Sequence, residues 1–175
     1  MTTILGKQFE NGFILVADSQ VTSGDQPYRH SMMQKIRRVG DLWIAAAGEA
    51  DLCDVIQYMW TPPKVSKRPD NLYSWMVSEV VPSMKWAFEK ANIPPKEKNE
   101  VAIFLIGAFD TLFLIESNVV MMREDGLYGI GSGGAYGVGA MAAGANPEKA
   151  VAIAAKFDVN TGGRIQVVRE GITHA

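Results

Sequence analysis

The chain has 175 residues, of which 47% are hydrophobic and 21% are charged, and its formal net charge is −2. This composition is typical of a globular protein, and the length predicts a single domain over residues 1–175. The lack of a basic excess argues against nucleic-acid binding, and no apolar run is long enough for a membrane-spanning helix.

The counts of cysteine and histidine exclude several kinds of site. Cys53 is the only cysteine, which excludes an internal disulfide and a cysteine-rich zinc site. His30 and His174 are the only histidines, too few for a histidine metal cluster. The N-terminus does not resemble a secretory signal peptide, so we expect a cytoplasmic protein.

The first part of the chain predicts short antiparallel strands joined by tight turns. Asn11-Gly12 is a strong hairpin signal between the first two strands. Residues 19–34 are polar and predict a loop or an irregular ribbon. The expected strands cover residues 3–9, 13–17, 35–39 and 42–47.

After Gly48 the spacing of apolar residues changes to that of helices. A first helix is expected before Pro62-Pro63, and a second over 71–91 contains Pro82, which should kink it. The expected buried face of the first helix consists of Leu52, Val55, Ile56, Met59 and Trp60. That of the second consists of Leu72, Met76, Val80, Met84 and Phe88.

The last third of the chain predicts strands, two helices and a final strand. Asn146-Pro147-Glu148 combines a capping side chain, a first-turn proline and an acid, and so predicts the start of a helix. That helix follows a glycine-rich turn over 129–134 and a helix of small residues. The expected strands cover 101–106, 111–116, 119–123 and 164–169, with turns over 107–110 and 158–163 and a connection over 94–100.

This order of elements predicts an α+β fold. Two antiparallel sheets packed face to face, each covered by a pair of helices, would bury both sheets and both helix stripes. The expected architecture is therefore a four-layer αββα sandwich.

Several polar motifs have ordinary structural explanations when taken singly. Gly129-x-Gly131-x-x-Gly134 matches the dinucleotide-binding fingerprint, but no parallel βαβ unit surrounds it, and its glycines would equally let two backbones pass closely. Asp18 alone indicates a strand end, and Lys35 alone indicates a solvent-exposed residue. Asp158-x-x-Thr161-Gly162-Gly163 alone indicates a turn.

Thr2 becomes chemically interesting only if Met1 is removed. Its free α-amine would have a reference pKa of about 7.7–8.0 and would serve as the base for its own hydroxyl. The alternative is that Thr2-Thr3-Ile4 simply starts the first strand.

Taken together and in order, these motifs resemble the β-type proteasome subunits and the HslV-type peptidases, which are N-terminal nucleophile hydrolases. The matching positions extend from residue 2 to about residue 170. They are Thr2-Thr3, Ala17-Asp18, Thr22-x-Gly24, Lys35, Ala47-Gly48-x-Ala50-Asp51, Gly131-Ser132-Gly133-Gly134 and Asp158-x-x-Thr161-Gly162-Gly163.

The resemblance implies a role for each matching side chain. Thr2 Oγ would attack a peptide carbonyl, with Lys35 as a nearby cation held by Asp18. The Gly48 N–H would stabilise the oxyanion. A hydrogen-bonded group around the Thr2 amine would consist of Ser132, Asp158 and Thr161, and the positions that pair with the substrate would be Thr22, Gly48 and Ala50.

The resemblance also implies partners. It implies stacked homo-oligomeric rings that cleave polypeptides in an enclosed chamber, with an AAA-type ATPase unfoldase as a partner and neither nucleic acid nor membrane. No cofactor would be required, although some relatives bind a monovalent cation such as sodium through backbone carbonyls. The matching carbonyls belong to Ala155, Asp158 and Thr161.

The sequence departs from the family pattern in three places. The segment between Asp18 and Lys35 is one residue longer than usual, Glu49 replaces a small residue, and Thr161 replaces a serine. The short N-terminus resembles HslV and the last turn resembles proteasome β subunits, so both branches stay open. Two alternatives also stay open, namely an inactive scaffold that retains Met1 and a small-molecule amidohydrolase of the same superfamily.

Overall fold

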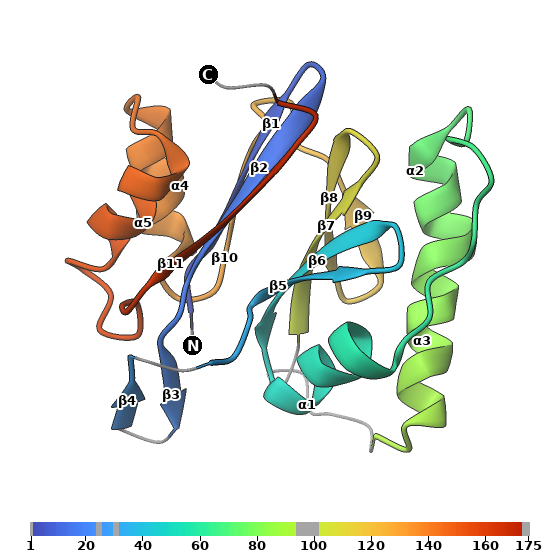
Figure 1. Cartoon of the computed structure of the whole chain (residues 1–175), viewed down its shortest axis with the longest axis horizontal. Helices are drawn as coiled ribbons and strands as arrows, with labels where there is room; N and C mark the ends of the chain where they lie inside the picture. The colour runs from blue at the N-terminus through green and yellow to red at the C-terminus, as the bar shows by residue number, and fades with distance from the viewer. Residues whose placement is uncertain (1, 24–25, 30–31, 94–101, 173–175) are drawn as a thin grey trace.

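The computed structural model of the chain describes residues 2–23, 26–29, 32–93 and 102–172 (Figure 1). Met1, Gly24, the expected connection over 94–100 and both histidines lie outside the described residues. The described strands form a four-stranded sheet, a five-stranded sheet and a two-stranded ribbon, and every pairing between them is antiparallel.

The four-stranded sheet has the order β10-β1-β2-β11. The predicted hairpin is confirmed, because Phe9 at the end of β1 lies opposite Gly12 at the start of β2. Strand β2 is buried along its whole length and ends at Asp18. The strands are β1 (Ile4–Phe9), β2 (Gly12–Asp18), β10 (Leu127–Ile130) and β11 (Ile165–Glu170).

The five-stranded sheet has the order β5-β6-β7-β8-β9. The turn expected over 107–110 is shorter than predicted, because β7 continues to Ala108. The polar stretch over 19–34 contains the ribbon β3 (Val21–Ser23) and β4 (Gln26–Tyr28). The sheet strands are β5 (Ile36–Val39), β6 (Leu42–Gly48), β7 (Ala102–Ala108), β8 (Thr111–Glu116) and β9 (Val119–Met121).

The prediction of a turn beginning at Gly129 is wrong, because this residue lies within strand β10. Gly129 pairs with Leu5 of β1. A Cβ atom at this position would lie 2.5 Å from the carbonyl oxygen of Gly134, in the first turn of the next helix. The close approach of β10 to that helix requires glycine at this position. Because glycine is depleted in strands, its presence makes the strand hard to predict from sequence.

The helices lie in two groups. The first contains α1 (Ala50–Asp54), α2 (Leu72–Trp75) and α3 (Val81–Lys90), with π-helical turns η1 (Val55–Met59) and η2 (Met76–Val80). Turn η2 ends at Val80, two residues before Pro82, where a kink was predicted. The second contains α4 (Gly134–Ala142) and α5 (Pro147–Ala154). No helix in the described ranges is both long and apolar enough to cross a membrane.

The predicted buried face of the first helix is wrong at Met59, whose side chain is 66% exposed. Gln57 is buried instead and is only 3% exposed. The π turn at Val55–Met59 explains the difference, because an i→i+5 turn contains more residues than an α-helical turn. Apolar spacing of 3.6 residues therefore no longer identifies the buried face.

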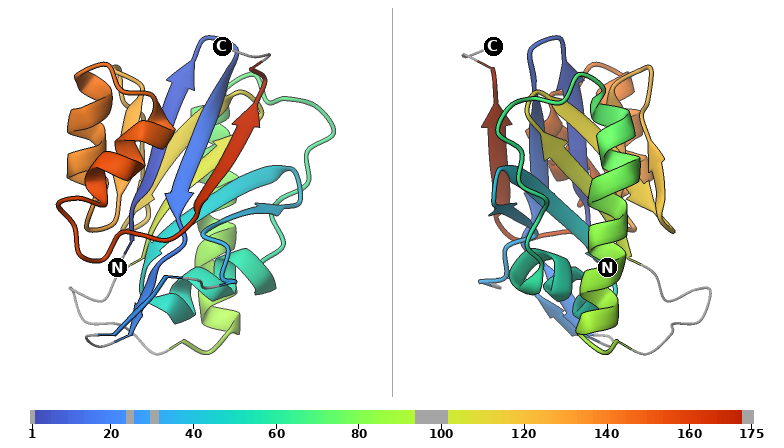
Figure 2. Two further views of the ribbon diagram at one scale, coloured as in Figure 1. Left: turned by 60° about the vertical axis from the view of Figure 1, so that its left-hand side comes forward. Right: turned by 90° about the vertical axis from the view of Figure 1, so that its right-hand side faces the viewer.

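Three apolar clusters occupy the faces of the two sheets. One joins the five-stranded sheet to α1–α3, as in the contact set that includes Ile44, Phe104 and Met76. Another lies between the sheets, and a third joins the four-stranded sheet to α4 and α5. Figures 1 and 2 show the two helix groups on opposite sides of the molecule. The predicted α+β class with antiparallel sheets is confirmed.

Candidate active site

One carboxylate oxygen of Asp18 accepts hydrogen bonds from three groups near the start of the chain and at Lys35. Asp18 is the last residue of β2 and is 2% exposed. Its Oδ1 atom accepts hydrogen bonds from the Thr2 hydroxyl and the Thr3 N–H, both at 2.9 Å. It also accepts one from the Lys35 ammonium at 2.7 Å. The structure therefore brings together three positions that the sequence predicted, namely Thr2, Asp18 and Lys35.

The second carboxylate oxygen of Asp18 is held by backbone groups. Oδ2 accepts hydrogen bonds from the N–H groups of Gln20 at 3.1 Å and Gly162 at 3.0 Å. Gly162 lies 144 residues away in sequence, in the turn that follows α5. Asp18 is thereby fixed in orientation by both neighbouring and distant backbone.

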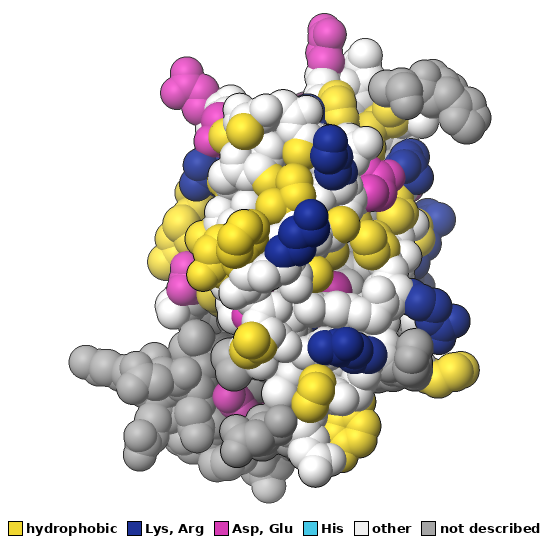
Figure 3. Space-filling view, turned by 90° about the vertical axis from the view of Figure 1, so that its left-hand side faces the viewer, with side chains coloured by type: hydrophobic (Ala, Val, Ile, Leu, Met, Phe, Trp, Pro, Cys, Tyr) yellow, Lys and Arg dark blue, Asp and Glu magenta, His cyan; other side chains and the backbone are white. Residues whose placement is uncertain are grey.

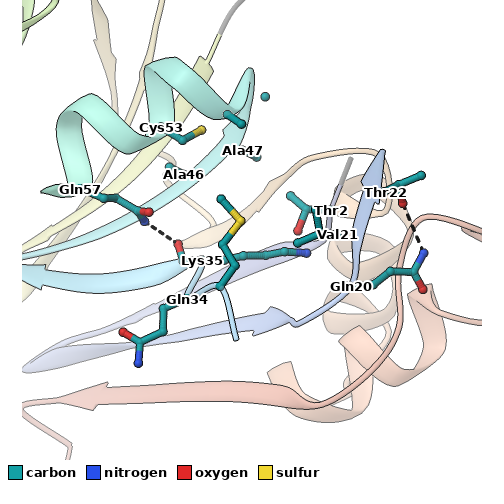
Figure 4. A pocket seen from close by; sticks show the side chains of 13 residues that line it. Thr2, Gln20, Val21, Thr22, Gln34, Lys35, Ala46, Ala47, Cys53 and Gln57 are labelled. Atoms are coloured by element: carbon teal, nitrogen blue, oxygen red, sulfur yellow. Dashed lines mark hydrogen bonds between the residues drawn. The ribbon is translucent and has the colours of Figure 1, made fainter. Parts of the chain in front are cut away.

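Lys35 is buried, with 8% of its surface exposed, although its sequence context alone indicated an exposed residue. Burial lowers the pKa of its ammonium below the usual value, while the charge and hydrogen bond of Asp18 and the charge of Asp158 oppose that shift. Figure 4 shows the side chain extending toward Thr2. A buried cation next to a hydroxyl is an arrangement that favours loss of protons from neighbouring groups.

A second polar cluster surrounds Asp158. The carboxylate Oδ2 atom accepts hydrogen bonds from Thr161 at 2.5 Å and Ser132 at 2.8 Å. Because the single hydroxyl proton of Thr161 goes to Asp158, the 2.5 Å contact between Thr161 and Thr3 has Thr3 as the donor. Burial raises the pKa of Asp158, but the hydrogen bonds from Thr161, Ser132 and Asn160 outweigh it, and the pKa is lowered overall.

The glycine-rich segment before α4 passes directly against the first residues of the chain. Gly131 has a φ of +82°, and a Cβ atom there would lie 2.1 Å from the carbonyl oxygen of Thr2. A Cβ atom on Gly133 would lie 1.8 Å from the Thr3 hydroxyl. The close-passing interpretation of these glycines is therefore confirmed. The described strand pairs provide no parallel βαβ unit for a dinucleotide.

A pocket opens beside Thr2 (Figure 4). It includes all the positions expected to contact a substrate, namely Thr22, Gly48 and Ala50. Gly48 ends β6 with a φ of +120°, a conformation that favours glycine, and turns the chain into α1. The other lining residues are Gln20, Val21, Met33, Gln34, Lys35, Ala46, Ala47, Cys53 and Gln57.

Sequence inspection missed three side chains near this pocket. Gln20 is fully buried and its Nε2 donates to the Val159 carbonyl at 2.8 Å. Gln57 donates to two backbone carbonyls and is also buried. Burial, and then the charges of Asp54, Asp51 and Glu49, raise the pKa of the Cys53 thiol to about 12, so that the thiol is neutral. A single glutamine or cysteine carries no pattern in sequence, so no signal identified them.

The described residues contain no group of three or more histidine, cysteine, aspartate or glutamate side chains suited to a metal ion. The carbonyls of Ala155, Asp158 and Thr161 belong to the end of α5 and the turn that follows. The Asp158 carbonyl accepts a hydrogen bond from the Thr161 N–H at 3.1 Å. Carbonyl oxygens are hard donors of the kind that a sodium ion prefers, so this cation site stays a prediction.

The chain is similar in sequence to proteasome-type proteins. A family model for the proteasome subunit matches residues 1–59. The HslV subunit of an ATP-dependent protease from Petrotoga mobilis is 28% identical over 137 residues, which cover 77% of this chain and 72% of that protein. The corresponding subunit from Trypanosoma brucei brucei is 29% identical over 138 residues, covering 77% and 62% respectively.

Comparison with solved structures supports the same fold. BPH from Thiobacillus denitrificans, solved in complex with epoxomicin, superposes with a TM-score of 0.77 at 20% identity, covering 99% of this chain and 100% of that chain. HslV from Trypanosoma brucei gives a TM-score of 0.65 at 23% identity, covering 98% and 100%.

Proposed function

Because this chain belongs to the family of proteasome β subunits and HslV-type proteins, we propose that it is a threonine endopeptidase whose N-terminal nucleophile is Thr2. The observation that carries the proposal is the convergence of the Thr2 hydroxyl and the Lys35 ammonium on Oδ1 of Asp18, beside a pocket. A buried hydroxyl, a cation and an adjacent cavity are the elements of an acyl-transfer site.

The proposed reaction begins with removal of Met1, which converts the Thr2 nitrogen into a primary amine. This amine takes the proton from Thr2 Oγ, directly or through a water, and Oγ bonds to the substrate carbonyl carbon. The Gly48 N–H stabilises the oxyanion, a kind of interaction worth about 3–4 kcal/mol. The amine then gives its proton to the leaving nitrogen as the peptide C–N bond breaks, and water hydrolyses the acyl ester.

Lys35 favours this reaction through its charge. A nearby ammonium favours the neutral form of the Thr2 amine, which is the form that acts as a base. Asp18 holds Lys35 in place and opposes the loss of its proton. The Asp158 cluster is connected to the residue after Thr2, because Thr161 bonds to both Asp158 and the Thr3 hydroxyl. We propose that this cluster orients the Thr2 amine.

The proposed substrate is an extended polypeptide that pairs with the backbone at Thr22 and Ala50. We further propose that the chain has the four-layer αββα architecture and works in cytoplasmic stacked rings of identical subunits, supplied by an AAA-type ATPase unfoldase. Apolar side chains among lysines and arginines cover the α4–α5 face (Figure 3). On that face Tyr136 and Phe157 stack at 5.8 Å while remaining half exposed, which supports a contact between subunits.

The test is the mass of the intact protein before and after incubation with a peptide epoxyketone, which reacts only where a hydroxyl and a free α-amine are adjacent. We expect loss of Met1 and one adduct per chain. Thr2→Ala should form no adduct, whereas Thr61→Ala, at an exposed position elsewhere, should react like the wild type. A retained Met1 without any adduct would contradict the proposal and favour the inactive scaffold. A monomer or dimer would argue against rings.

A further inference from the structure

Two glutamines hold the backbone from which the Lys35 side chain extends. Gln57 Nε2 donates hydrogen bonds to the carbonyls of Lys35 at 3.0 Å and Ile44 at 3.3 Å. On the other side, Gln166 Nε2 donates to the Ile36 carbonyl at 2.6 Å, while its Oε1 accepts from the Ile36 N–H at 3.2 Å. The Lys35-Ile36 segment is therefore clamped by two side-chain amides.

The two amides come from opposite sides of the interface between the sheets. Gln166 belongs to β11 of the four-stranded sheet, where it pairs with Ala17, next to Asp18. Gln57 belongs to the π turn η1, which packs beside the five-stranded sheet. Gln166 offers Ile36 both a donor and an acceptor, as a neighbouring strand would. The two glutamines therefore fix the backbone of Lys35 relative to both the four-stranded and the five-stranded sheet.

The burial of Gln57 follows from a local departure from α-helical geometry. Its neighbours Tyr58 and Met59 are largely exposed, although Met59 fits the apolar spacing of an α-helix. The π turn instead directs Gln57 toward the Lys35 segment (Figure 4). Short π-helical turns within helices are frequent at functional sites.

We propose that Gln57 and Gln166 are positioning residues of the proposed reaction: from two sides they fix the backbone of Lys35, and so the place of its ammonium near Thr2. The proposal rests on the proposed function. Lys35 lies between the polar stretch over 19–34 and the first residue of β5, and its ammonium is held at the far end of the side chain by Asp18. Loss of either the backbone hydrogen bonds from the glutamines or the ion pair with Asp18 would move the Lys35 ammonium relative to Thr2.

The experiment compares Gln57→Met and Gln166→Met with the wild type by measuring kcat/KM for a peptide as a function of pH. When the ammonium moves away from Thr2, the amine pKa rises, so the acidic limb of the profile should move to higher pH. We also expect kcat/KM to fall between about 10-fold and 100-fold, because small misplacements of catalytic groups have effects of this size.

Gln8→Met is the matched control. Gln8 also clamps backbone, with hydrogen bonds to the carbonyls of Phe9, Gly12 and Asp110 and from the Leu112 N–H, but it does so at the hairpin end of β1, away from the pocket. It should lower the melting temperature without moving the pH profile. A purely structural role for Gln57 and Gln166 would give the same result as this control.

Each outcome is decisive. A shift of the acidic limb in both site variants but not in Gln8→Met supports the proposal, and profiles that superimpose on the wild type overturn it. Gln57→Asn and Gln166→Asn shorten the side chain by one methylene and so break these hydrogen bonds without adding a charge, and they replace the methionine variants if those do not fold. Rates are expressed per subunit that reacts with epoxyketone. If wild-type protein neither cleaves nor reacts, the proposed function itself fails.

Discussion

The Lys35 ammonium lies 2.7 Å from Oδ1 of Asp18, and both side chains are buried. Removing one partner of such a pair leaves a buried charge unpaired, which costs about 3–5 kcal/mol. Asp18→Asn should therefore lower the free energy of unfolding by about this amount and abolish most peptide cleavage. Chemical denaturation and initial rates at neutral pH measure the two effects.

The double variant Asp18→Asn with Lys35→Met provides the control for this ion pair. Because it removes both charges, it should be more stable than Asp18→Asn alone while remaining inactive. Equal stability of the single and double variants would show that the buried charge is not the source of the loss.

Gly133→Ala should disrupt the cluster beside Thr2, because the new Cβ atom would meet the Thr3 hydroxyl at 1.8 Å and the Thr161 hydroxyl at 2.7 Å. Cleavage should fall at least about tenfold, and stability should fall by about 1–3 kcal/mol as in other overpacked sites. Gly139→Ala in the same helix region is the control, because nothing lies within 4 Å of its added atom. Replacing this helical glycine should raise stability by about 0.5–1 kcal/mol.

The free energy of unfolding at acidic pH should depend on the ionisation of Asp158. Its hydrogen bonds lower the folded-state pKa below the ordinary value of 3.8. The carboxylate therefore contributes stability above the unfolded-state pKa, and this contribution disappears as pH falls through the folded-state value. In urea denaturation below about pH 4, Asp158→Asn should lose less stability per pH unit than the wild type. Parallel pH profiles of the two proteins would contradict this assignment.

Cys53 should be unreactive in the folded protein, because its thiol is buried and has a pKa of about 12. Only the thiolate reacts quickly with an alkylating reagent. At pH 8, iodoacetamide should leave the native chain unmodified and should add one group in denaturant, as read by mass spectrometry. Rapid alkylation of the folded chain would show that the thiol is ionised or exposed.

Features set by nearby residues could be predicted from the sequence. Asn11-Gly12 forms the expected hairpin, and Asn146 caps α5 by accepting a hydrogen bond from the Lys149 N–H. The buried stripe of the second helix was likewise predicted, and Met76, Val80 and Met84 are buried. Each depends on local backbone geometry or a regular period, which the sequence displays directly.

Features set by distant contacts could not be predicted in the same way. Lys35 lies directly before β5 and is buried where its ammonium meets Asp18, at the end of β2 in the other sheet. The sequence spacing alone does not reveal this contact. Gly129 hides a strand because its missing side chain makes room for α4. Gln57 is buried because the π turn changes the helical period. The candidate site residues were predicted from the family resemblance, and their roles stay predictions.

Under the proposed function, the position of Thr2 makes cleavage depend on residues that are synthesised late. Strand β1, which starts two residues later, is paired on one side with β10 near residue 130, and Asp18 is held by the N–H of Gly162. A chain still emerging from the ribosome therefore already contains Thr2 but lacks the later residues that hold Thr2 and Asp18 in place. Under the proposed function, a partly made subunit has no assembled active site, so cleavage waits until the last turn has folded.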